Sequence, residues 1–158
     1  MKKYGMHGLT DSIKEFFDRS TRELTEADSG FAPKEGMYTV AQTVAHVAQT
    51  FEWFVGGAFA PEGFSMDWER MDKEVRAVTS LAAARAWMDR AVASTKASID
   101  AHTEEEWALP LPDGPIMGGM PRYLVLGSLN DHTAHHRGAL TVYARLLGKV
   151  PPMPYMEM

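Results

Sequence analysis

The chain has 158 residues, of which 45% are hydrophobic and 23% are charged, and its formal net charge is −5. This length and composition are typical of one soluble globular domain, and we expect a single domain over residues 1–158. Its lysines and arginines are scattered, whereas binding to nucleic acid or to an anionic membrane requires clustered basic residues. We therefore expect a small-molecule partner, with no nucleic acid and no membrane.

The sequence contains no cysteine. This excludes a disulfide framework, a thiolate metal site and a cysteine nucleophile, so any metal must be held by histidine and carboxylate groups. The first seven residues lack the apolar run of a signal peptide, and no stretch approaches eighteen uninterrupted apolar residues. The sequence predicts a cytoplasmic protein.

Apolar residues at helical spacing predict the first two helices. The first is expected from about Leu9 to Ala27, where Asp28-Ser29-Gly30 supplies a stop. The second opens at Thr39, whose spacing to Gln42 matches a capping box, and is predicted to end at Gly56-Gly57.

A polar, aromatic connection from about Pro61 to Thr79 follows the second helix. Its length suits the long crossover of a helical bundle, and Trp68 to Val78 could hold a short helix. The third helix is expected from Ser80 to about His102, and Thr103 with Glu106 has the spacing that caps a brief extra turn.

Proline and glycine exclude a helix from Leu109 to Gly119. The fourth helix is predicted to begin at Pro121 and to run to about Leu147, where Gly148 ends it. The pattern contains four main helices and no persuasive strand. It therefore predicts an all-α fold, a four-helix bundle with a long crossover connection.

Three histidines are the most informative feature of the sequence. On one helix, His132 and His136 would lie about 40° and 6 Å apart, close enough to share an ion. His46 falls in the first half of the second helix, beside its apolar stripe. If those two helices face one another, His46 completes a set of three imidazoles that leaves one coordination position open, as catalytic metals require.

The ordinary alternative for each histidine is a structural residue with conventional hydrogen bonds. A pair on the buried face is harder to explain in this way, because two adjacent imidazoles are costly in a core unless both are satisfied. His135 is predicted on a flank, Arg137 on the solvated side, and His7 and His102 as exposed residues near helix ends. The aromatic residues of the second and third helices are predicted to be core: Phe51, Trp53, Phe54 and Trp87.

The run Asn130-Asp-His-Thr-Ala-His-His-Arg-Gly138, with the later Tyr143-Ala-Arg-Leu-Leu-Gly148 and a Pro-Pro tail, resembles the C-terminal signature of the DinB-like superfamily. That superfamily includes relatives of bacillithiol and mycothiol S-transferases. Thr39-Val40 with His46 is similar to its first ligand segment. One departure is Ala139, which stands where many members have a glutamine.

The resemblance implies a bundle with one crossed connection, commonly a homodimer, in which His46, His132 and His136 bind a divalent metal. It also implies that His135 is not a ligand. Three neutral imidazoles suit zinc, nickel or iron. The superfamily covers thiol transferases, an isomerase and members without an assigned activity, so the resemblance specifies the site better than the reaction.

The first functional hypothesis is a metal-dependent enzyme, either a thiol-dependent S-transferase or a hydrolase. The metal would lower the pKa of a bound water or of a low-molecular-weight thiol, which then attacks a small electrophile. Gln49 and Thr50, one turn beyond His46, would line the pocket, and the loop from Leu109 to Met120 would cover its mouth. The alternative is a non-catalytic, dimeric stress-response or binding protein with a structural metal.

Overall fold

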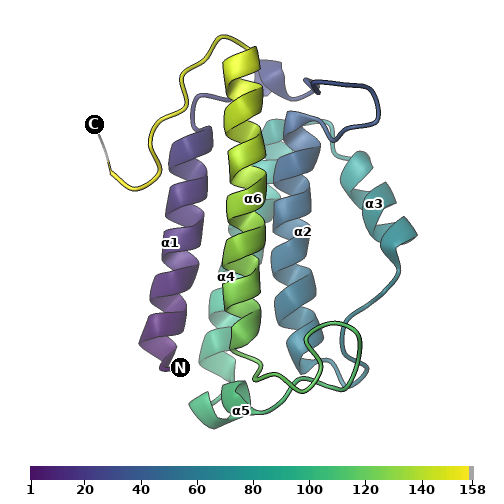
Figure 1. Ribbon diagram of the computed structural model, residues 1–158, viewed down its shortest axis with the longest axis vertical. Helices are drawn as coiled ribbons and strands as arrows, with labels where there is room; N and C mark the ends of the chain where they lie inside the picture. The colour runs from purple at the N-terminus through teal and green to yellow at the C-terminus, as the bar shows by residue number, and fades with distance from the viewer. Residues whose placement is uncertain (157–158) are drawn as a thin grey trace.

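The computed structural model describes residues 1–156, which form helices joined by loops (Figure 1). The long helices are α1 (Lys3–Thr21), α2 (Val40–Phe59), α4 (Leu81–Ala101) and α6 (Leu124–Leu146), and the shorter elements are the 3-10 turn η1 (Glu26–Asp28), α3 (Trp68–Arg76) and α5 (Glu104–Ala108). The described residues contain no strand, only an isolated bridge between Pro110 and Pro121. None of their helices is both long and apolar enough to cross a membrane. The predicted all-α four-helix bundle is confirmed.

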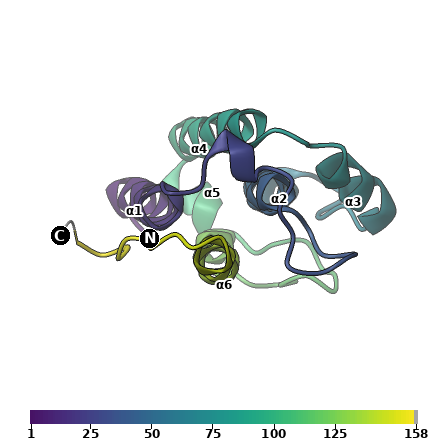
Figure 2. The same cartoon turned by 90° about the horizontal axis from the view of Figure 1, so that it is seen from above.

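Seen end on, α1 and α2 stand at opposite corners of the bundle, and each contacts both α4 and α6 (Figure 2). Helices α2 and α4 begin at the same end, because Ser29 accepts a bond from the Ala41 amide with its carbonyl and one from the Leu81 amide with its hydroxyl. Two parallel helices that are consecutive in the main bundle need a connection along its whole length. The segment between them, with α3, makes that predicted crossover.

Helix α1 differs from its predicted bounds at both ends. It begins at Lys3 and stops at Thr21, six residues before Ala27. The reason for the early stop is local: Thr25 and Asp28 form their own capping box, which starts η1 in place of a further α-helical turn. The buried face of α1 includes Phe17, while Phe16 is only half-buried.

Helix α2 begins as predicted, since Thr39 and Gln42 form a reciprocal capping box. It does not end at the glycine pair but continues to Phe59. A Cβ atom on Gly57 would lie 2.3 Å from the ring of Phe64, so this glycine serves close packing inside the helix and does not terminate it. Most of α2 is buried, which makes it the most enclosed helix of the bundle.

The remaining boundaries follow the predicted signals with one exception. Ser80 caps α4, and Thr103 with Glu106 caps α5. Helix α6 starts at Leu124, three residues after Pro121, because the backbone before it pairs with the end of α5 and the residue after it. The Arg122 amide donates a hydrogen bond to the Leu109 carbonyl, and the Tyr123 amide donates one to the Trp107 carbonyl. Gly148, at φ 74°, follows the end of α6 as expected.

The capping box of α2 gives a testable expectation, because it positions the helix that carries His46. Thr39→Ala is expected to lower the free energy of unfolding by about 1 kcal/mol, since the amide of Gln42 loses its acceptor. Thr39→Ser keeps that acceptor and should retain most of the stability. Urea unfolding of the two variants beside the wild type measures the difference, and equal stability of all three would contradict this role.

Candidate metal centre

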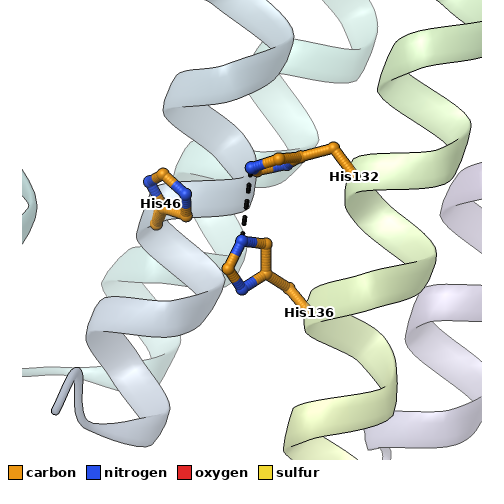
Figure 3. A group of neighbouring side chains, drawn as sticks. All are labelled: His46, His132 and His136. Atoms are coloured by element: carbon orange, nitrogen blue, oxygen red, sulfur yellow. Dashed lines mark hydrogen bonds between the residues drawn. The ribbon is translucent and has the colours of Figure 1, made fainter.

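The three histidines meet where α2 and α6 face one another (Figure 3). His46 approaches from α2 and its ring centroid lies 5.0 Å from that of His132 and 4.7 Å from that of His136, both on α6. Each ring offers a nitrogen, and the three nitrogens all lie within 4.8 Å of one another. The structure thus brings together the three residues that the sequence singled out and meets the condition that their helices face each other.

The histidines lie beside the core stripe of α6 and not at its centre. The buried stripe runs through Leu129, Thr133 and Leu140, whereas His132 and His136 are half-buried. This corrects the prediction that the histidine pair lies on the buried face of the helix. Helix α6 packs against both α1 and α2, and its histidines are left at the edge of the core, beside the cavity that His132 lines.

Burial keeps these imidazoles neutral. Together with the smaller effect of the neighbouring imidazoles, it lowers the pKa of His132 to about 4 and that of His136 to about 3. Burial also lowers the pKa of His46, against a weaker opposing effect of the Asp72 carboxylate. At neutral pH all three rings therefore carry a free lone pair, which is the form of histidine that binds metals.

The spacing of the nitrogens fits a divalent ion. The Nε2 atoms of His132 and His136 are 3.2 Å apart. Two nitrogens that share a tetrahedral ion at 2.0–2.1 Å would be separated by about 3.3–3.4 Å. In addition, the buried Nδ1 of His132 has no hydrogen-bond partner among the described residues, which leaves this ring less satisfied than a structural histidine.

A cavity of about 310 Å³ opens beside the histidines. His46 and His132 form part of its wall, and the predicted pocket residues Gln49 and Thr50 line it as well. Thr50 turns its hydroxyl to the carbonyl of His46, while the Gln49 amide donates to the Met71 carbonyl and to the Glu74 carboxylate. Gln49 therefore joins α2 to α3 at the cavity wall.

The cover of the cavity differs from the prediction. No residue of the 109–120 loop lines it, whereas Trp68, Met71 and Asp72 of the crossover do. The loop folds on itself where α6 begins, with the Leu111 amide bonded to the Met120 carbonyl. Its backbone forms hydrogen bonds within the loop, and α3 lies beside the cavity where the sequence predicted this loop.

Several cavity residues were missed or misassigned by sequence reasoning. Trp53 was predicted as core but is only half-buried and lines the cavity, whereas Phe51 and Phe54 are buried as expected, Phe54 also lines the cavity, and Trp87 packs against the core. The signal for Trp53 was present, because residues 46, 49, 50 and 53 share one helix face. No comparable signal marked the residues of α3, since their position depends on how α3 packs against α2.

A bonded network ties α3 to the start of α2 beside the site. The Tyr38 hydroxyl donates to Oδ1 of Asp72 at 2.6 Å, and Nε of Arg76 donates to Oδ2 at 2.8 Å. Burial and the Asp72 carboxylate raise the pKa of Tyr38 to about 12. The Tyr38 hydroxyl therefore stays protonated and acts as a donor to Asp72 at physiological pH.

The other titratable residues lie outside the cluster. His135 is exposed and is not one of the three converging residues. His7 and His102 are half-buried and not exposed as predicted: His7 contacts Asp100, and His102 stacks on Phe59. Arg137 is also half-buried and lies over the rings of Phe16 and Tyr155, which corrects its predicted solvation.

Comparisons with known proteins agree with this picture of the fold. The structure is similar to that of YfiT from Bacillus subtilis, described as "a probable metal-dependent hydrolase with an unusual four-helix bundle topology", with a TM-score of 0.69 and 15% sequence identity over 93% of this chain and 88% of that chain. No curated protein matches the sequence significantly. The model of the DinB family matches residues 14–158. This match covers most of the chain, which therefore belongs to the DinB family.

Proposed function

We propose that the chain is a metal-dependent enzyme in which water or a low-molecular-weight thiol attacks a small electrophile. The observation that carries this proposal is the convergence of His46, His132 and His136, three neutral imidazoles from two helices, beside a cavity that His46 and His132 line. The likeness in fold to YfiT, itself described as a probable metal-dependent hydrolase, gives further support.

The three histidines would hold a divalent ion, which supplies Lewis acidity toward a water, a thiol or a substrate oxygen at the end of the cavity. The residues of the chain do the rest. Trp53 and Trp68 line the cavity and would exclude bulk water beside the ion. Asp72 is bonded to Tyr38 and Arg76 and holds α3 in place. Because the sequence has no cysteine, any thiol must come from a cosubstrate.

The test compares two nucleophiles on protein reconstituted with zinc, nickel or iron. Ester hydrolysis, followed with 4-nitrophenyl acetate, reports water as the nucleophile; conjugation of cysteine or glutathione to 1-chloro-2,4-dinitrobenzene reports a thiol. His136→Ala is expected to reduce the observed rate to that of the reagents alone, whereas the exposed neighbour His135→Ala should keep it. Absence of any rate above the uncatalysed reaction, with both nucleophiles and all three metals, would count against an enzyme.

A structural metal is the second candidate, because an ion on these ligands would join α2 to α6. Chelation distinguishes the two. A structural ion predicts that the chelated protein unfolds or melts at a much lower temperature, whereas a catalytic ion predicts that turnover is lost and the fold persists. A small-molecule partner and a homodimer remain predictions of this proposal, and light scattering tests the dimer.

A further inference from the structure

The walls of the cavity point to the kind of molecule that it accepts. We propose that the cavity binds an uncharged, flat aromatic or conjugated molecule, which packs against Trp53 and Trp68 with its reactive end toward the histidines. Calling this molecule the substrate rests on the proposed function, whereas its binding does not.

Four aromatic side chains, Tyr38, Trp53, Phe54 and Trp68, line the cavity beside the histidines. Trp53 lies 5.5 Å from Trp68 and 4.9 Å from Phe54 between ring centroids, and both pairs are inclined to one another. Trp68, on α3, is 49% exposed although it is the largest type of apolar side chain. Indole faces at such angles leave room for offset or edge-on contacts with another flat ring. An exposed tryptophan that also lines a cavity is typical of a residue whose contact is completed by a ligand.

Four of the side chains on the wall already use their hydrogen-bond donors within the protein, whereas no bond is formed by the Trp68 indole N–H among the described residues. The four donate as follows: Tyr38 to Asp72, Gln49 to Met71 and Glu74, Thr50 to His46, and Trp53 to Ser65. A substrate rich in hydroxyl or carboxylate groups would have to give up its hydration and would find few free partners in exchange. The histidines and the Trp68 N–H are the main polar groups left to interact with it, so the molecule needs few polar groups.

The charges beside the cavity are also paired. The Asp72 carboxylate accepts bonds from Tyr38 and Arg76, and the Arg76 guanidinium also lies 4.8 Å from the centroid of the Tyr38 ring. Neither a cation nor an anion would therefore find a free opposite charge among these groups, and its desolvation would be uncompensated. The volume of about 310 Å³ is at the lower end of ligand pockets, which suits a molecule of one or two rings.

The four tryptophans provide an internal control for the test. Trp53 and Trp68 line the cavity, whereas Trp87 and Trp107 do not. Metal-free protein labelled with nitrogen-15 is titrated with nitrobenzene, a flat, uncharged and unreactive probe, and the indole N–H signals are followed by NMR. We expect the signals of Trp53 and Trp68 to shift and those of Trp87 and Trp107 to stay in place.

Variants and charged probes sharpen this experiment. Trp68→Ala is expected to weaken nitrobenzene binding by about tenfold or more, while Trp68→Phe, which keeps a ring, should bind nearly as well. Trp87→Phe is the matched control and should leave nitrobenzene binding unchanged. Binding of 4-nitrobenzoate and 4-nitrobenzylammonium to the metal-free protein should be weaker than that of nitrobenzene.

Each outcome decides the proposal. It is overturned if the signals of Trp53 and Trp68 do not shift, if all four signals shift equally, or if either charged probe binds as tightly as nitrobenzene. The metal content of the same preparation, measured before chelation, keeps the two proposals apart. Binding of nitrobenzene by a protein that takes up no metal would remove the proposed enzyme and keep this inference, whereas metal uptake without nitrobenzene binding would do the reverse.

Discussion

Replacing His132 by alanine is expected to reduce the affinity for a divalent metal by about 100-fold or more, since even groups that only orient a metal ligand contribute about 10–100-fold. The wild type should retain one ion per chain through gel filtration at low free metal, and His132→Ala should not. Elemental analysis of untagged protein measures the ratio. His135→Ala is the matched control, because His135 lies on the same helix but is exposed and outside the cluster.

Stability measurements separate loss of metal from loss of fold in this experiment. Without metal, His132→Ala is expected to unfold at nearly the same urea concentration as the wild type, because the alanine removes a buried Nδ1 that has no partner among residues 1–156. With metal, only the wild type should gain stability, since a ligand that binds the native state alone stabilises it. Equal metal content in both proteins would contradict the site.

The largest effect on stability is expected from Trp107→Ala, which should lower the free energy of unfolding by about 3–5 kcal/mol. Trp107 is 0% exposed and packs edge-on against Phe59, with ring centroids 4.7 Å apart. It lies on α5 and belongs to the hydrophobic core, and its carbonyl accepts a hydrogen bond from the Tyr123 amide just before α6. Truncation would leave a cavity that the short helix cannot close.

Urea unfolding of metal-free protein measures this loss, and Trp68→Ala is the control. Trp68 is 49% exposed, so its replacement should cost about 1 kcal/mol or less. The comparison uses the same change of residue at a core position and at the rim of the cavity. Similar losses for the two variants would show that Trp107 does not hold the end of the bundle.

Local signals predicted much of the helical structure. The Thr39–Gln42 and Thr103–Glu106 capping boxes form as their spacing indicates, because both partners lie within one turn. The same kind of motif explains why the predicted end of α1 was wrong. Thr25 and Asp28 also form a capping box, which the sequence analysis overlooked because apolar residues at helical spacing continue past Thr21.

Predictions from glycine positions and from helical periodicity were less reliable, because both depend on residues that are distant in the sequence. Gly57 lies inside α2 since the ring of Phe64 occupies the place of a side chain. Similarly, the core stripe of α6 passes through Leu129 and Thr133 and leaves His132 at its edge. A periodicity of 3.6 residues defines a face but not the direction in which neighbouring helices approach it.

The sequence by itself determined the helical pattern, the crossover and the identity of the three histidines, because spacing along a helix places His132 and His136 on one face. Only the tertiary structure decided that α2 lies against α6 and brings His46 to them. It also decided that α3, and not the 109–120 loop, closes the cavity with Trp68. Packing between segments far apart in the chain depends on the shapes of both surfaces together, which no local pattern specifies.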